Sequence, residues 1–126
     1  METCLYVADL EAAEVFYSEV LGLEKISSVK GRHVFLKCES TVLLLFNPEM
    51  TSQPTESQVP LHGAHGPCHI AFETTDDALS SWRQHLQQHR IEIETEIDWP
   101  QGGHSIYFRD PDGNSLEVVT PRTWGF

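Results

Sequence analysis

Three side chains of this sequence could together hold a divalent metal: Glu2, His69 and Glu117. Each stands in a short segment whose apolar and polar residues alternate, as they do in a β-strand with one buried face. The apolar residues of each segment are expected to pack beneath a helix, so the three candidate ligands point to the opposite face. One imidazole and two carboxylates on one face suit a divalent metal. The three segments are residues 2–8, 68–74 and 115–120.

Alternation alone leaves a plainer interpretation open. A glutamate on the free face of a strand is usually solvated, and a histidine in a strand is usually a satisfied polar residue. Arg109 could orient an anionic substrate, or it could pair with Asp110 or another acid. His104 follows Gly102-Gly103, where backbone could approach a ligand closely, although a tight turn explains these glycines equally well. The residues expected to line a substrate site are Tyr6, Tyr107, Arg109 and His104.

The elements that would position these residues occur twice in the same order: a strand, a helix and three further strands. In the first half the helix follows Asp9, a plausible N-cap, and ends at Gly22. In the second half Asp110-Pro-Asp-Gly-Asn114 predicts a turn. The expected strands are residues 2–8, about 23–30, 32–38 and 41–47, then 68–74, about 91–97, 104–109 and 115–120. We therefore predict an α+β fold of tandem βαβββ modules. The modules and their linker are about 1–47, 68–121 and 48–67.

The composition is that of an ordinary folded domain. The 126 residues, 40% of them hydrophobic and 21% charged, suit one domain, residues 1–126, with its own core. Nineteen acidic against eight basic side chains give a net charge of -11, which would repel nucleic acid and an anionic membrane surface. No apolar run approaches the length of a membrane span. Three cysteines without a C-x-x-C pair favour reduced thiols in a cytoplasmic protein.

Several strings along the chain resemble the vicinal oxygen chelate superfamily, the glyoxalase, bleomycin-resistance and extradiol-dioxygenase group. They are Tyr6-Val-Ala-Asp9-Leu-Glu, Phe16-Tyr17, Val20-Leu-Gly22-Leu, His69-Ile-Ala-Phe, and Tyr107-Phe-Arg-Asp110-Pro-Asp-Gly113-Asn with Leu116-Glu117. The resemblance implies that each βαβββ module forms a curved mixed sheet, and that two modules make a half-barrel cup around a metal. It also implies a homodimer with two equivalent sites, for which the C-terminal Trp124-Gly-Phe126 is a candidate contact.

The resemblance also carries the metal ligands onto this chain. It places them at His69, at Glu117 and at Glu2, where the family commonly has histidine. The fourth ligand position of glyoxalase I enzymes falls in Val42-Leu-Leu-Leu-Phe46, which is entirely apolar. Three protein ligands resemble the fosfomycin-resistance and extradiol-dioxygenase arrangements better. Two carboxylates with one imidazole favour Mn²⁺, Fe²⁺, Ni²⁺ or Zn²⁺.

Two functions follow as competing expectations. The first is a metal-dependent enzyme whose metal chelates two neighbouring oxygens of a small substrate. Glu2 or Glu117 could transfer protons if substrate displaces one of them from the metal. Its chemistry would be that of a lyase or isomerase. A dioxygenase would need redox-active iron, and thiol addition of the fosfomycin type is disfavoured by the few basic residues. The second function is metal-free binding of a small molecule or drug, as in bleomycin-resistance proteins.

Overall fold

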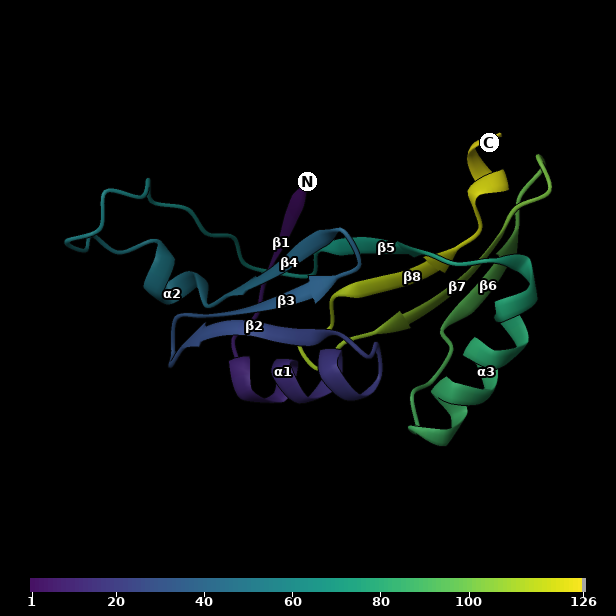
Figure 1. Ribbon diagram of the computed structural model, residues 1–126, viewed down its shortest axis with the longest axis horizontal. Coiled ribbons are helices and arrows are strands. Elements are labelled where there is room, and N and C mark those ends of the chain that lie inside the picture. The colour runs from purple at the N-terminus through teal and green to yellow at the C-terminus, as the bar shows by residue number, and fades with distance from the viewer. Residues whose placement is uncertain (126) are drawn as a thin grey trace. The chain divides into compact units, whose positions relative to one another are not determined.

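The computed structural model describes residues 1–125 and divides the chain into two compact units, Met1–Cys68 and the segment from His69 onward. Each unit contains one four-stranded mixed sheet, with strand orders β1-β4-β3-β2 and β5-β8-β7-β6 (Figure 1). The first strand of each sheet runs parallel to the last strand of the same unit, and the other pairs are antiparallel. The predicted α+β class with two βαβββ units is confirmed. Phe126, part of the proposed tail contact, lies outside the described residues.

The first unit follows the predicted order closely. Asp9 caps α1, since its carboxylate accepts a hydrogen bond from Ala12 N at 2.9 Å. Gly22 takes φ +68°, the left-handed conformation that ends a helix with least strain. The buried core lies between α1 and one face of the sheet and includes Leu36, Leu43 and Leu45. The elements are β1 Glu2–Tyr6, α1 Leu10–Glu19, β2 Glu24–Val29, β3 His33–Cys38, β4 Thr41–Phe46 and α2 Pro48–Thr51.

The segment predicted as a linker contains a short helix, α2, at its start. Asn47 accepts a hydrogen bond from Glu49 N, and Pro48 occupies the first turn, where its missing N–H costs nothing. Further along, His62 N donates to Thr51 O at 3.2 Å. The linker is therefore tied back to its own unit at His62.

The second unit repeats the order with two departures from the predicted bounds. Its helix opens with a 3-10 turn, and β6 begins at Thr95 rather than near residue 91. Arg90 takes φ +57°, and Ile91 N bonds to Leu86 O, so the chain leaves the helix through a tight turn before the sheet begins. The elements are β5 His69–Glu73, η1 Asp76–Ala78, α3 Leu79–Gln88, β6 Thr95–Asp98, β7 His104–Arg109, β8 Ser115–Val119 and η2 Pro121–Trp124.

The turn between β7 and β8 is built around one buried carboxylate. Asp110, which is 5% exposed, accepts hydrogen bonds from Asp112 N, Asn114 N and Asn114 Nδ2, each at 2.9 Å. The turn sets the register that brings Tyr107 opposite Glu117. The predicted turn is confirmed, and it aligns the two strands that carry the candidate site.

One face of the second sheet is a fully buried apolar layer. Ile106, Phe108, Leu116 and Val118 are each 0% exposed. Because neighbours along a strand point to opposite faces, the intervening residues of β7 and β8 line the other face. This second face carries the polar side chains Ser105, Tyr107 and Glu117.

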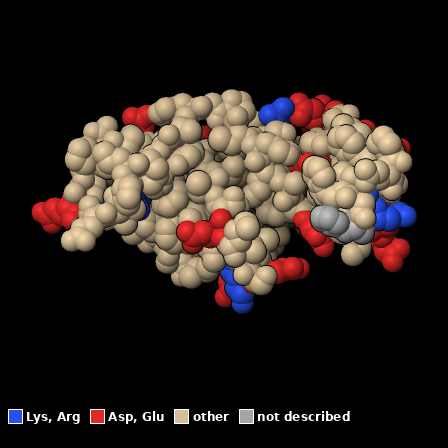
Figure 2. Space-filling model, turned by 90° about the horizontal axis from the view of Figure 1, so that it is seen from above, with Lys and Arg blue, Asp and Glu red and all other residues tan. Residues whose placement is uncertain are grey.

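The acidic surplus is not concentrated in one patch on the face drawn in Figure 2, where small acidic groups alternate with uncharged surface. Within residues 1–125, no helix is long and apolar enough to cross a membrane.

Candidate functional site

Two of the three predicted metal ligands lie together in the second unit. The parallel register of β5 and β8 aligns His69 with Ser115 and Ala71 with Glu117. The imidazole of His69 then lies beside Glu117, with Nε2 3.3 Å from Oε2. Side-chain exposure is 52% for His69 and 9% for Glu117, so a buried carboxylate meets an imidazole that solvent reaches.

A backbone carbonyl fixes the orientation of the His69 ring. Nδ1 lies 3.0 Å from Ser115 O, and a carbonyl only accepts, so Nδ1 carries a proton. In the neutral ring Nε2 then presents a lone pair to the Glu117 carboxylate, and two acceptors facing each other need a cation between them. Nitrogen and oxygen ligands of one zinc ion lie about 3.0–3.4 Å apart at ordinary bond lengths and angles. The observed separation fits a shared metal ion as well as it fits a proton.

The second oxygen of Glu117 has a different partner. The hydroxyl of Ser105, which is fully buried, donates to Oε1, and Ser105 Oγ accepts from Trp99 Nε1 at 2.7 Å. Tyr107 completes this polar group. Its pKa is raised by burial first and then by the charge of Glu117 and the hydrogen bond to it, while a hydrogen bond with Ser105 acts in the opposite direction. The Tyr107 phenol therefore stays protonated beside the carboxylate.

Glu2, the third predicted ligand, lies on β1 of the first unit, is exposed, and pairs with Val42. Among residues 1–125, no group of three or more His, Cys, Asp and Glu side chains is arranged to hold a metal. The ligand role of Glu2 therefore stays a prediction.

The first sheet carries a group of aromatic side chains on the face away from its buried leucines. Tyr6, Phe46 and His33 lie side by side across β1, β4 and β3. The ring of His33 stacks on Phe35, with centroids 4.1 Å apart. His62, from the linker, packs against Phe46 and bonds through Nδ1 to the Tyr6 hydroxyl at 2.8 Å. We call Tyr6, His33, Phe35, Phe46 and His62 the aromatic face.

Two residues of the aromatic face, His33 and Tyr6, have pKa values shifted in the direction that favours their neutral forms. The pKa of His33 is lowered by burial and then by the Arg32 guanidinium, which donates to its Nδ1 at 2.9 Å. The pKa of Tyr6 is raised, mainly by burial and then by Cys4. As the sequence indicated, the neighbouring Val42-Leu-Leu-Leu-Phe46 segment offers no polar ligand.

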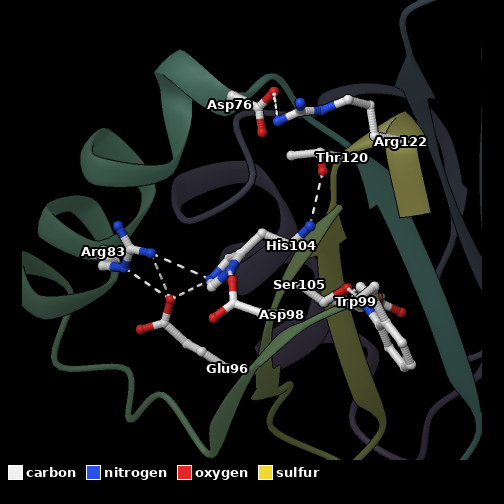
Figure 3. A network of polar contacts seen from close by, with 10 residues as sticks. Asp76, Arg83, Glu96, Asp98, Trp99, His104, Ser105, Thr120 and Arg122 are labelled. Carbon is white, nitrogen blue, oxygen red and sulfur yellow. Dashed lines mark hydrogen bonds and ion pairs between the residues drawn. The ribbon is translucent and has the colours of Figure 1, made fainter. Parts of the chain in front are cut away.

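His104, predicted to line the site, belongs to a different cluster. Its Nε2 lies 2.8 Å from Glu96, its Nδ1 lies 2.7 Å from Asp98, and Arg83 of α3 bonds to the same Glu96 oxygen (Figure 3). Burial would lower the pKa of His104, but the hydrogen bonds to the two carboxylates outweigh burial and raise it. The pKa of Glu96 is lowered, chiefly by the hydrogen bond from Arg83. His104 and Ser105 point to opposite sides of β7 (Figure 3), so His104 is directed away from Glu117.

Arg109 forms a bidentate ion pair with a surface acid, Glu94, in agreement with the plainer interpretation of pairing with Asp110 or another acid. Its Nε and Nη2 lie 3.1 Å from the two oxygens of Glu94, and Nη1 donates to Gly113 O at 3.0 Å. Arg109 and Glu94 line an open pocket of about 290 Å³ together with Arg90, Ile91 and Glu92. An anionic substrate would have to displace Glu94 from Arg109.

The sequence did not predict the hydrogen bond of Trp99 to Ser105 or that of His62 to Tyr6. Trp99 lies just past β6, and a tryptophan beside a predicted polar strand face was the available signal, since a buried indole N–H needs an acceptor. His62 lies in a histidine-containing stretch of the predicted linker, with nothing in the sequence to pair it with β1. Its link to Tyr6 spans 56 residues, which no local pattern reveals.

Comparison with known proteins gives a consistent result over almost the whole chain. A model of the Glyoxalase/Bleomycin resistance protein/Dioxygenase superfamily matches residues 2–118. A solved structure of lactoylglutathione lyase from Agrobacterium tumefaciens is 43% identical, with a TM-score of 0.96, covering 100% of this chain and 96% of the other. Metallothiol transferase FosB of Staphylococcus epidermidis is 28% identical, over 93% of this chain and 78% of its own length. Glutathione transferase FosA of Serratia marcescens is 29% identical, over 90% and 74%.

Proposed function

Because the chain belongs to the Glyoxalase/Bleomycin resistance protein/Dioxygenase superfamily, we propose that it is a divalent-metal-dependent enzyme acting on a small oxygen-bearing substrate. One observation carries this proposal: His69 Nε2 and Glu117 Oε2 face each other across 3.3 Å, with the His69 ring fixed by Ser115 O. The names of the lyase and the metallothiol transferase similar to this chain support an enzyme. The 43% identity to a lactoylglutathione lyase favours the lyase or isomerase class over a dioxygenase.

In the proposed site His69 and Glu117 hold Mn²⁺, Fe²⁺, Ni²⁺ or Zn²⁺, and Glu2 of a second copy supplies the third ligand in a homodimer. When bound, the metal would polarise two neighbouring substrate oxygens and stabilise negative charge on them.

The chain's own residues have distinct tasks in this proposal. Glu117 is held by Ser105 on one side, and its other oxygen could accept a substrate proton if substrate displaced that oxygen from the metal. Glu2 is the second candidate for proton transfer. Tyr107, which keeps its proton because its pKa is raised, can donate a hydrogen bond at this face. Tyr6 is proposed to line the substrate site from the aromatic face.

The aromatic face favours a second candidate function, metal-free binding of an apolar or aromatic small molecule. Four of its rings lie within 6.4 Å of the Phe46 centroid, namely those of Tyr6, His33, Phe35 and His62. Such a face binds a ligand by stacking and burial without a metal. We place this candidate second because it leaves the facing pair of His69 and Glu117 without a role.

Metal binding separates the two functions. We expect purified protein to contain one of the four metals, or to gain about 2.7 kcal/mol in free energy of unfolding at a metal concentration 100 times its Kd. His69→Ala combined with Glu117→Gln should abolish both effects.

The matched control is His65→Ala with Glu49→Gln. That histidine and glutamate lie 3.4 Å apart but are mostly exposed. Absence of any metal and of any stabilisation by metal would leave the binding protein as the better description.

A further inference from the structure

Glu117 presents two unlike oxygens. Oε1 accepts the hydroxyl proton of Ser105, whereas Oε2 lies 3.3 Å from His69 Nε2. The Ser105 side chain is fully buried and Glu117 is 6% exposed. Water therefore cannot readily replace Ser105 as the hydrogen-bond donor to Glu117. Oε1 thereby has a buried donor, and Oε2 faces His69. Tyr107, which lies beside them, also hydrogen-bonds to the Glu117 carboxylate.

The direction of the Ser105 hydrogen bond is set by Trp99. An indole N–H can only donate, so Trp99 Nε1, at 2.7 Å, occupies a lone pair of Ser105 Oγ. The single hydroxyl proton of Ser105 is then available for Glu117, whose ionised carboxylate can only accept. Trp99 and Ser105 lie together on one side of β7, away from the His104 cluster (Figure 3). The result is a one-way chain of donors that ends on Glu117 Oε1.

We infer that Trp99 and Ser105 are positioning residues that cap Oε1 and so make Glu117 a ligand through Oε2 alone. The inference rests on the proposed function, in which Glu117 and His69 hold a divalent metal. A carboxylate ligand can bind through one oxygen or through both, and hydrogen bonds from beyond the metal decide between these modes. The cap would therefore leave Oε2 as the Glu117 oxygen that holds the metal.

The test uses the metal alone, with no substrate. Co²⁺ affinity is measured by competition with a chelating dye for wild type, Ser105→Ala, Ser105→Thr and Trp99→Phe. Ser105→Ala should weaken binding about 10–100-fold, the usual effect of removing a partner of a metal ligand. Ser105→Thr keeps the hydroxyl and should bind as wild type does. Trp99→Phe should weaken binding less, and should add nothing on the Ser105→Ala background.

Trp82→Phe is the matched control. The Trp82 indole donates to Thr74 Oγ1 at 3.0 Å in the same unit and has no link to Glu117, so its removal should leave Co²⁺ affinity unchanged. The visible spectrum of bound Co²⁺ gives a readout that loss of packing would not move. Freeing Oε1 in Ser105→Ala should raise the coordination number and weaken the absorption bands. Wild-type affinity and spectrum in Ser105→Ala, or equal effects of Trp82→Phe and Trp99→Phe, would overturn the inference.

Metal binding by the wild-type protein distinguishes failure of the proposed function from failure of this inference. If wild type binds no divalent metal, the proposed function is wrong, and the donor chain is judged in the metal-free protein by NMR of the Trp99 indole proton. Glu117→Gln should move this resonance and Ser105→Ala should speed its exchange with solvent. If Glu117→Gln leaves the chemical shift of the Trp99 indole proton unchanged and Ser105→Ala leaves its exchange rate unchanged, the chain of hydrogen bonds from Trp99 to Glu117 is refuted.

Discussion

Replacing Asp110 by alanine should destabilise the second unit strongly, although Asp110 is not a candidate ligand. Its carboxylate organises the turn between β7 and β8 by accepting from Asp112 N, Asn114 N and Asn114 Nδ2. Asn114 is 1% exposed, so water cannot readily replace the carboxylate at the two Asn114 donors. The Asp112 N–H is only part-buried and can be hydrated after the substitution.

The magnitude follows from these two buried donors. A buried donor that loses its acceptor costs about 1–3 kcal/mol, and local relaxation recovers part of that cost, so Asp110→Ala should lower the free energy of unfolding by about 3 kcal/mol. Asp110→Asn keeps one acceptor oxygen and should cost about half as much.

Urea unfolding followed by tryptophan fluorescence measures this change in the relevant unit. All three tryptophans, Trp82, Trp99 and Trp124, belong to the second unit. With a slope of about 2 kcal/mol per molar urea, Asp110→Ala should lower the midpoint by about 1.5 M. Asp77→Ala, at an exposed site on η1, should change the free energy of unfolding by less than about 1 kcal/mol. If Asp110→Ala cost no more than this control, the account of the turn would be refuted.

Three further changes test the same unit. Raising the pH from about 6 to 9 should lower the free energy of unfolding. A histidine whose pKa is higher in the folded than in the unfolded state stabilises the fold fully below its unfolded pKa. That stabilisation is lost as the pH rises through the folded pKa. His104 is such a group, because the hydrogen bonds to its carboxylate partners outweigh burial, and urea unfolding of His104→Gln should show a flatter pH profile. Glu117→Gln should lower the pKa of Tyr107 by removing a neighbouring charge, as measured by tyrosinate absorbance; an unchanged titration would contradict this. Gly103→Ala should cost about 1–3 kcal/mol in thermal or urea unfolding, because its Cβ would overlap the Thr123 backbone; wild-type stability would contradict the packing seen there.

Local chemistry made most of the fold predictable. Alternation located the strands, and the Asp9 cap lies where the sequence indicated. The start of β6 was placed too early, because Ile91 and Ile93 continue the alternation of a strand. The left-handed turn at Arg90 is not encoded by glycine or asparagine, so only the packing of the folded unit reveals it.

The candidate site was partly predictable for the same reason. Strand alternation implies that His69 and Glu117 share a face, and the register of β5 and β8 places them in contact. The same alternation sets His104 apart, since it shares its face with the buried Ile106. The hydrogen bond from Trp99 to Ser105 depends on the β6–β7 turn and on the rotamer of the indole. No local sequence pattern predicts either of them.

The parallel pairing of β5 with β8 also fixes when the site can exist. His69 and the Ser115 carbonyl that orients its ring are 46 residues apart, with α3, β6 and β7 between them. During synthesis His69 leaves the ribosome long before Ser115 and Glu117, and a single imidazole holds a divalent ion weakly. His69 and Glu117 first come together when β8 docks beside β5. A metal held by this pair, as the proposed function has it, would therefore be bound by a folded unit and not by a growing chain.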